Sequence, residues 1–295
     1  MTDAIDVSAR AFAAISAGTG TYPPRMHFAV QGGDALVMPG YDGRSYLGTK
    51  IVVVRRAANG EAGTRACYLL MTAGDAQPVL LCDGTALTAL RTGAAAGLAT
   101  RTLARKDARV VALFGVGGQA AEQLAGVAAA RAITEVRVVG RDPARAEGFV
   151  RGMGARYPHI RFSRSGAEDA VRRADIVIAA TNSTTPIFDA SWVRPGTHVN
   201  GIGSFRPDMR ELDAALFARA RVYVDEREAA ISEAGELIEA LGTHVLSLDR
   251  ISEIGTAPGF ARTSDDEITV FKTVGHAALD LLTAVALLDR DAAAA

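Results

Sequence analysis

The sequence predicts an α/β protein with two parts, a doubly wound parallel sheet and a smaller α+β unit. From about Arg109 onward, apolar strand-like runs alternate with helical patterns, which is typical of a parallel sheet covered by helices on both faces. A glycine-rich turn joins the first of these strands to the first helix. Residues 1 to about 95 instead hold short β-like runs, broken by turns rich in glycine and aspartate.

The smaller unit draws on both ends of the chain. Short apolar runs predict strands at 35–41, 49–57 and 65–71, in an antiparallel or mixed arrangement. The chain turns helical after Asp83-Gly84, over 82–104. The run 271–288 predicts a strongly apolar helix, buried against another element or another subunit. We therefore expect one unit from 1–95 together with 272–295, and a second unit from 96–271.

The larger unit reads as a series of strands and helices. Its Val/Ile-rich runs are apolar on both faces, as buried parallel strands require. The expected strands are 109–115, 135–140, 160–163, 174–181, 196–203 and 220–225. The expected helices are 117–130, 143–153, which opens with a proline in its first turn, and 165–174.

Composition narrows the class of protein. The formal net charge is −1, from 32 basic and 33 acidic residues, which gives no support to binding of nucleic acid or of anionic membranes. No apolar run is long enough to span a bilayer, and the N-terminus does not read as a signal peptide. The two cysteines, Cys67 and Cys82, lack metal-ligand spacing and predict reduced core thiols of a cytoplasmic protein.

The turn Gly115-Val116-Gly117-Gly118-Gln119-Ala120 matches the dinucleotide-binding pattern G-x-G-x-x-A. The first glycine permits the tight turn, the second lets the backbone approach a pyrophosphate, and Ala120 lets helix and strand pack closely. The alternative is a glycine-rich turn in a doubly wound domain that binds no nucleotide. The strand before the turn, the helix after it and the next strand favour the nucleotide.

Eight blocks spread over nearly the whole chain carry a more specific signal. They are PPRMHF, LGTKIV, DGTALTALRTGAA, FGVGGQA, IAATNSTTPIF, HVNGIGSFRPDMREL, DEREAAISEAGELI and ITVFKTVGHAALD. In this order they resemble the ornithine cyclodeaminase/mu-crystallin family. The resemblance implies a Rossmann domain plus a second domain that pairs across a homodimer and holds substrate. It also implies reduction of a C=N bond by a nicotinamide, or a related oxidation, with small α-imino or α-amino acids as substrates.

By the same resemblance, Arg25, Lys50 and Arg91 stand where the family contacts substrate. An arginine suits a carboxylate because its planar fork donates two parallel hydrogen bonds. A lysine that opens a buried strand has a depressed pKa and is suited to proton transfer. The alternatives are surface or salt-bridge arginines and a snorkelling lysine at a strand edge.

The expected cofactor contacts lie at the glycine turn, at the end of the second strand and in two later segments. Thr181 follows a strand, and ligands of open α/β sheets bind beyond the carboxyl ends of strands; the alternative is an ordinary polar turn. The resemblance also puts Phe271, Lys272 and Gly275 near the nicotinamide, although Gly275 can equally permit close packing. The predicted cofactor residues are Gly115, Gly117, Gly118, Gln119, Ala120, Arg141, Thr181, Asn182, Ser183 and Lys272.

The chain departs from the cyclodeaminases at Phe205, where they carry an aspartate that assists loss and re-addition of an amine. The stretch Pro207–Leu212 instead matches the Pro-Asp-x-Arg-Glu-Leu pattern of ketimine reductases. We interpret Asp208 with Glu211 as a helix capping box rather than as the catalytic acid.

The choice of nicotinamide depends on the end of the second strand. An acidic residue there binds the ribose 2′-hydroxyl of NAD and repels a 2′-phosphate. Here the position is Gly140, followed by Arg141, which can pair with a phosphate. We therefore expect NADPH to be preferred, with NADH possible. The alternatives are that Arg141 pairs with Asp142 or solvent, and that Asp142 still reaches a ribose.

These observations predict a homodimeric ketimine reductase that converts Δ1-pyrroline-2-carboxylate or Δ1-piperideine-2-carboxylate to L-proline or L-pipecolate. Lys50 would orient the imine and supply the proton, directly or through a water. The alternatives are an ornithine cyclodeaminase, an alanine-type amino-acid dehydrogenase, or a protein that binds NADPH and a ligand without turnover. His198, His244 and His276 are isolated in sequence, so we expect structural roles for them and no metal.

Overall fold

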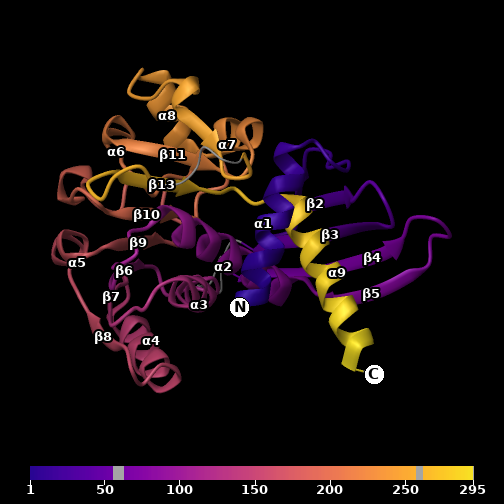
Figure 1. Ribbon diagram of the computed structural model, residues 1–295, viewed down its shortest axis with the longest axis horizontal. Helices are drawn as coiled ribbons and strands as arrows, with labels where there is room; N and C mark the ends of the chain where they lie inside the picture. The colour runs from indigo at the N-terminus through magenta and orange to yellow at the C-terminus, as the bar shows by residue number, and fades with distance from the viewer. Residues whose placement is uncertain (56–62, 257–261, 295) are drawn as a thin grey trace.

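The computed structural model describes residues 1–55, 63–256 and 262–294. Within these ranges the chain forms two sheets, which lie side by side with helices between and around them (Figure 1). An antiparallel five-stranded sheet comes from the first third of the chain, and a parallel eight-stranded sheet from the remainder. The predicted α/β fold class is confirmed, as is the contrast between its two parts.

The smaller sheet has the order β1-β2-β3-β4-β5, each strand antiparallel to its neighbours. Its strands are Met26–Val30, Gly33–Tyr41, Tyr46–Arg55, Gly63–Thr72 and Pro78–Asp83. Three of them correspond to predicted strands; residues 56 and 57 of the second prediction lie outside the described residues. Helix α9 (Ala277–Ala294) covers one face of this sheet and packs beside α1 (Thr2–Ser16), as Figure 1 shows.

The other face of this sheet is apolar and exposed. Side chains alternate across a strand, so Lys50 and Val52 point inward while Leu47 and Ile51 point outward. The pairing register puts further exposed apolar side chains on the outward face. The large apolar residues exposed there are Met26, Phe28, Leu47, Ile51 and Leu81. An exposed apolar surface of this kind usually marks an interaction site.

The larger sheet has the order β12-β11-β13-β10-β9-β6-β7-β8, with parallel pairing throughout. Its chain order reverses between β6 and β9, and this switch point of a doubly wound sheet is where ligands bind. All six predicted strands form, within a few residues of the expected bounds. The strands are β6 Val110–Phe114, β7 Glu135–Val139, β8 Arg161–Arg164, β9 Ile176–Ala179, β10 His198–Gly201, β11 Ala220–Val224, β12 Ile251–Glu253 and β13 Ile268–Lys272.

Strand β13 was not predicted. It joins late in the chain and inserts between β10 and β11, which leaves it fully buried. Helices flank the sheet as expected of this fold. They are α3 Ala120–Ala130, α4 Pro143–Arg156, α5 Ala167–Arg173, α6 Ala214–Arg219, α7 Arg227–Glu233 and α8 Gly235–Gly242, with short 3-10 turns at Ala190–Trp192 and Leu248–Arg250.

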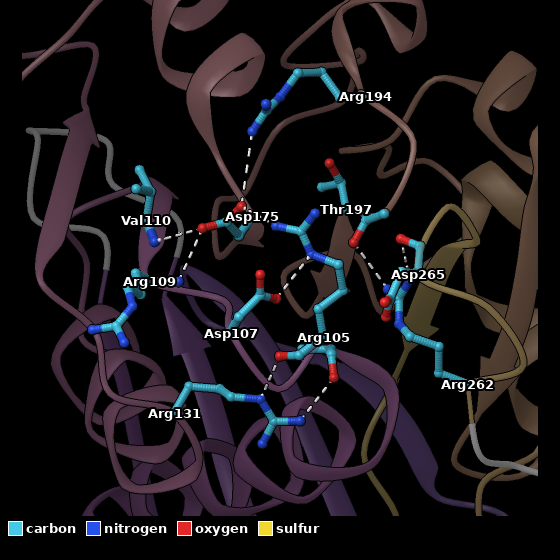
Figure 2. Close-up of polar contacts among 12 residues, drawn as sticks. Arg105, Asp107, Arg109, Val110, Arg131, Asp175, Arg194, Thr197, Arg262 and Asp265 are labelled. Atoms are coloured by element: carbon cyan, nitrogen blue, oxygen red, sulfur yellow. Dashed lines mark hydrogen bonds and ion pairs between the residues drawn. The ribbon is translucent and has the colours of Figure 1, made fainter.

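Helix α2 (Gly84–Leu103) connects the two sheets and packs closely on α3. Added methyl groups at Gly93 and Gly97 would collide with α3 backbone atoms, so glycine permits this contact. At its C-terminal end, Arg131 donates hydrogen bonds to the Arg101, Ala104 and Arg105 carbonyls. Figure 2 shows the Arg131 guanidinium beside Arg105. These arginine contacts satisfy carbonyls that the helix end leaves free and fix α2 to the larger unit.

Figure 2 also shows how Asp175 anchors the start of β6. Its carboxylate accepts hydrogen bonds from the Arg109 and Val110 amides and from the Arg105 guanidinium. This cluster lies at the N-terminal ends of the parallel strands, away from the edge where ligands bind. We therefore assign it to stability.

Three expectations about local structure were wrong. The third helix begins at Ala120, so Gly117, Gly118 and Gln119 precede it rather than forming its first turn. Lys50 lies in the middle of β3 rather than opening it. Cys67 is exposed and is not a core thiol, because it lies on the outward face of the small sheet.

The predicted capping box at Asp208 is also wrong. No helix begins there: the next one, α6, starts at Ala214 and is capped by Asp213. Asp208 instead pairs with Arg206 on the surface. Glu211 is fully buried and accepts hydrogen bonds from backbone amides of two loops, so a motif with capping spacing serves a tertiary contact.

None of the helices in the described ranges is long and apolar enough to span a membrane.

Candidate active site

Three buried charged side chains meet between the small sheet and the helices that cover it. The Lys50 Nζ lies 2.7 Å from Asp280 Oδ2, and the Arg91 Nε lies 3.0 Å from Asp280 Oδ1. Lys50 comes from β3, Arg91 from α2 and Asp280 from α9, so three distant segments of sequence build the cluster. Lys50 is 1% exposed, which excludes the snorkelling alternative. Arg91 is 5% exposed, so it is not a surface arginine, but it does form the salt bridge that its alternative interpretation predicted.

Burial and charge set the ionisation of this cluster. Burial lowers the pKa of Lys50 to about 8, although the Asp280 carboxylate opposes the shift. For Asp280, burial alone would raise the pKa, but Lys50 and Arg91 outweigh it and hold the pKa below its usual range. The pair is therefore ionised at neutral pH, with a lysine that loses its proton far more easily than an exposed one.

The Arg91 guanidinium retains a free donor. Its Nη1 is buried and has no hydrogen-bond partner among the residues that the structure describes. An unsatisfied buried charged group costs free energy, so it indicates a ligand that satisfies it. Gly275, at a φ of +84°, makes room for it, because an added Cβ would lie 2.8 Å from Nη1. Close packing is thus one role of Gly275, and a planar anion such as a carboxylate suits the free donor.

Arg25 contacts the same backbone segment through the segment's carbonyl groups. Its Nη2 donates to the Gly275 carbonyl at 2.6 Å and to the Val274 carbonyl at 3.1 Å. Its Nε lies 3.1 Å from Glu233 Oε1, at the end of α7. Arg25 therefore has the salt bridge that its alternative interpretation predicted, and it contacts the same Gly275 segment that Arg91 approaches.

The segment 273–275 is itself fixed from the larger sheet. The Asp225 carboxylate, which follows β11, accepts hydrogen bonds from the Thr273 hydroxyl and from the Val274 and Gly275 amides. This carboxylate sets the backbone that Arg25 and Arg91 contact. The smaller and larger units thus meet at the cluster.

The glycine turn has the geometry that a dinucleotide needs. Gly115 adopts a φ of +94°, and an added Cβ would lie 2.3 Å from the Ala180 carbonyl oxygen, so only glycine fits at this switch point. A Cβ added at Gly117 or Gly118 would meet no described atom within 4 Å, so the backbone there is open to a ligand. Among the residues that the structure describes, no side chain caps the N-terminus of α3, so its first amides can bind an anion. These features fit the pyrophosphate of a dinucleotide.

The loop after β9 lies against the glycine turn at Gly115, and Glu211 fixes its backbone. The Glu211 carboxylate accepts hydrogen bonds from the amides of Thr181, Gly203 and Ser204. Burial raises the pKa of Glu211, while Lys272 opposes that shift. The Thr181 hydroxyl accepts a hydrogen bond from the Ser183 amide at 3.2 Å, which keeps the loop compact.

Lys272, a predicted cofactor residue, has its ammonium enclosed by the protein. It is fully buried, and its Nζ donates to the Gly201, Ser204 and Thr273 carbonyls. Glu236 lies 3.6 Å from the same Nζ. All of its donors are used, so Lys272 fixes the loop rather than presenting its ammonium to a ligand.

At the end of β7, Arg141 donates to the Asn182 side chain at 3.2 Å. The structure thus joins two predicted cofactor residues. Asp142 is the N-cap of α4 and accepts hydrogen bonds from the Ala144 and Arg145 amides. Arg141 therefore pairs with Asn182 rather than with Asp142, and the Asp142 carboxylate is committed to the helix.

The histidines have different environments. His198 is fully buried between Thr269 and Asn200, and burial lowers its pKa to about 3. His276 accepts a hydrogen bond from the Ala278 amide at the start of α9, and its ring packs against Tyr22. Within the described ranges, no group of histidine, cysteine and acidic side chains is arranged to hold a metal ion.

Comparison with known proteins agrees with this geometry. The sequence profile of the ornithine cyclodeaminase/mu-crystallin family matches residues 1–294. The chain belongs to this family. A Δ1-pyrroline-2-carboxylate reductase of Bacillus cereus is 34% identical over 98% of this chain and 92% of its own length.

Two solved structures extend the likeness to the whole fold of this family member. The Δ1-pyrroline-2-carboxylate reductase of Thermococcus litoralis, in complex with NADH and L-proline, superimposes with a TM-score of 0.93 at 32% identity, covering 99% of this chain and 93% of the other. An archaeal alanine dehydrogenase dimer with bound NAD gives a TM-score of 0.91 at 31% identity, covering 99% and 92%.

Sequence reasoning missed the carboxylates of the family member's site. Asp280, Glu233, Asp225 and Glu211 were not predicted, although each contacts a predicted residue or the backbone beside one. Asp280 carried a signal: it is an acidic residue within a strongly apolar helix, where a charge needs a buried partner. The other three lie in ordinary polar surroundings in sequence, and nothing local marks them.

Proposed function

We propose that this protein reduces a cyclic α-imino acid, Δ1-pyrroline-2-carboxylate or Δ1-piperideine-2-carboxylate, to L-proline or L-pipecolate. The observation that carries the proposal is the free, buried Nη1 of Arg91 beside the ionised Lys50–Asp280 pair. It offers an anion-binding donor and a readily lost proton within one cluster. The likeness to two Δ1-pyrroline-2-carboxylate reductases, each over more than nine-tenths of both chains, supports the choice of substrate.

Arg91 binds the substrate carboxylate, because a carboxylate satisfies its free donor through a charge-assisted hydrogen bond. Arg25 closes the other side of the site. Its Nε and Nη2 are already engaged with Glu233 and two carbonyls, so it contributes mainly position and positive charge. Holding the imino acid from its carboxylate fixes the C=N bond in one orientation, which removes much of the entropic part of the barrier.

Lys50 supplies the proton to the imine nitrogen, directly or through a water that it holds. A protonated imine is the better hydride acceptor, and a general acid works best with a pKa near the working pH. With a pKa of about 8, Lys50 is mostly protonated at neutral pH and gives up its proton at modest cost. The products balance: one hydride reaches carbon and one proton reaches nitrogen.

The cofactor is a nicotinamide dinucleotide, NADPH in preference to NADH, and when bound it supplies the hydride. The residues that would hold it are the glycine turn Gly115–Ala120, the Thr181–Ser183 loop and Arg141. Open space at Gly117 and Gly118 and the uncapped start of α3 support this. Gly140 and Arg141 support the 2′-phosphate, because this position carries no acidic side chain and Oδ1 of the neighbouring Asp142 caps α4.

The unit of 1–95 with 272–295 binds substrate and mediates a homodimer, and 96–271 is the cofactor-binding domain. Two copies would bury the outward apolar face of the small sheet, from Met26 and Phe28 to Leu81. A dimer also occurs in the similar archaeal alanine dehydrogenase. Light scattering at micromolar concentration should give twice the monomer mass, and Leu81→Lys should weaken the association. A monomeric unmodified chain would exclude this arrangement.

We place the protein in the cytoplasm, where its two free cysteines stay reduced.

The decisive experiment follows the absorbance of NADPH on addition of Δ1-pyrroline-2-carboxylate. Rapid oxidation with formation of L-proline is expected. Ammonia release from L-ornithine with NAD would instead indicate a cyclodeaminase. Oxidation of NADH on addition of pyruvate and ammonia would indicate an alanine dehydrogenase. Phe205, half-buried against the core of the larger unit, disfavours both. Tight binding of every imine without turnover would favour a ligand-binding protein.

A further inference from the structure

We propose that Asp280 is a positioning residue that holds Lys50 protonated and turns Arg91 so that its Nη1 faces the substrate carboxylate. The part that concerns substrate rests on the proposed reduction. The part that concerns Lys50 does not, because it is a property of the folded chain.

The geometry assigns one carboxylate oxygen to each cation. Oδ2 of Asp280 lies 2.7 Å from the Lys50 Nζ, and Oδ1 accepts a hydrogen bond from the Arg91 Nε at 3.0 Å. Asp280 is fully buried, so no water competes for these contacts. By binding Nε, Asp280 occupies the inner edge of the guanidinium and leaves Nη1 without a partner among the described residues. The same side chain therefore fixes the proton donor and the anion-binding donor.

The groups that surround Lys50 give Asp280 the decisive charge. Arg91 on α2 and Arg25 before β1 both disfavour the ammonium, as does burial. Across the strand pair, Tyr68 on β4 is buried, and burial first and Asp280 second raise its pKa, so it stays neutral. Asp280 on α9 is the carboxylate that opposes these effects. Without it, the ammonium would face two guanidinium groups in a buried site.

The arrangement couples the two halves of the reaction. When Lys50 gives its proton to the imine, the Asp280 charge loses one of its two cations and favours recapture of a proton by Lys50. Arg91 remains bound to Asp280 through Nε during this step. The substrate carboxylate therefore keeps its position while the Lys50 amine is reprotonated. Asp280 thus restores the acid after each turnover without contacting the substrate.

Lysine-selective NMR tests the proposal directly, because the chain contains three lysines, Lys50, Lys106 and Lys272. Lys106 is exposed and serves as the internal reference. In the unmodified protein the Lys50 side chain should titrate near pH 8. In Asp280→Asn the midpoint should fall by about 1 to 3 pH units, since a close opposite charge has been removed. A Lys50 midpoint that is unchanged in Asp280→Asn would overturn the proposal, whatever reaction the protein catalyses.

Glu236→Gln is the matched control, because it removes a buried carboxylate beside the other buried lysine, 3.6 Å from Lys272. It should leave the Lys50 titration in place. If Asp280→Asn fails to fold, the double variant Lys50→Met/Asp280→Asn should regain a cooperative thermal transition, because no unpaired ammonium remains. Failure of this rescue would also count against the proposal.

Binding and kinetics test the part that concerns substrate. In Asp280→Asn the affinity for L-proline, measured by calorimetry, should fall roughly tenfold, because a rotated Arg91 loses part of a charge-assisted contact. As the pH is raised, kcat of the Asp280→Asn protein should begin to fall at a lower pH than kcat of the unmodified protein. A shifted Lys50 titration with unchanged proline affinity would retain the proton role and reject the Arg91 role. Absence of any imine reduction in the unmodified protein would reject the proposed function alone.

Discussion

Two buried lysines in this protein have opposite uses. Lys272 is fully buried, and three backbone carbonyls and Glu236 account for its ammonium. Lys50 is equally buried, yet among the described residues its ammonium pairs with a single carboxylate, and Arg91 beside it keeps a donor without a partner. A buried cation whose hydrogen-bond donors are all paired stabilises a fold. A cluster that keeps an unpaired donor can bind a ligand through it. Burial of a lysine therefore indicates function only when its neighbours are also considered.

The largest expected effect separates these two lysines by activity. Lys50→Met should lower kcat for imine reduction by roughly 10²- to 10⁴-fold, because general acid catalysis is lost. Dissociation of NADPH, measured by fluorescence, should change little. A Lys50→Met protein with unmodified kcat at all pH values would make Lys50 as structural as Lys272.

The free energy of unfolding should depend on Lys272, the lysine that we do not expect to act in catalysis. Lys272→Met should reduce the free energy of unfolding by about 3–5 kcal/mol, because Glu236 and Glu211 lose a buried cation. Urea unfolding followed by circular dichroism measures this. Lys106→Met, at an exposed site, is the control and should stay within about 0.5 kcal/mol of the unmodified protein. Equal stability of the Lys272 and Lys106 variants would contradict the structural role of Lys272.

The free donor of Arg91 distinguishes it from Arg25. Arg91→Ala should raise KM for the imino acid roughly tenfold to a hundredfold, since a charge-assisted hydrogen bond is worth about 1.5–3 kcal/mol. Arg25→Ala should raise KM less, because Arg25 is already bound to Glu233 and two carbonyls. Steady-state kinetics at saturating NADPH would reveal the order. Larger losses in Arg25→Ala than in Arg91→Ala would reverse our assignment of the carboxylate.

Cofactor choice should depend on the end of β7 rather than on either lysine. The unmodified protein should prefer NADPH by about tenfold in kcat/KM. This is the affinity that one charge-assisted hydrogen bond from Arg141 to the 2′-phosphate would contribute. Gly140→Asp should invert this preference through repulsion of the 2′-phosphate. An added Cβ at Gly140 lies 3.1 Å from the Ala146 Cβ, so α4 must shift slightly to accept the change. Equal efficiency with NADH and NADPH in the unmodified protein would disprove the role of Arg141.

The smallest effect is a pH dependence that only Lys50 should impose. Lys50 must be protonated to act as the acid, so kcat for reduction should be constant below pH 8 and fall above it, in line with a pKa of about 8. The decline should approach tenfold per pH unit. His198, with a pKa of about 3, stays neutral throughout and should leave no trace in this range. A rate that increases between pH 7 and pH 9 would exclude Lys50 as the proton donor.

The sequence by itself determined the alternation that produces the parallel sheet, the glycine turn and the antiparallel first part. These follow from local patterns: apolar runs of strand length, a G-x-G-x-x-A turn, and turn residues between short strands. It also determined the family, because eight blocks recur in order. Lys50 was predicted as a functional residue partly because it is an ionisable residue in an apolar run.

Tertiary structure alone decided which charges pair and which remain free. Asp280 lies 230 residues from Lys50 and 189 from Arg91 in sequence, and only the packing of α9 on the small sheet brings them together. The same reason explains why Glu211 holds two loops instead of capping a helix, and why β13 was missed between two earlier strands. Electrostatic partners and sheet insertion depend on contacts between distant segments, and local spacing does not encode them.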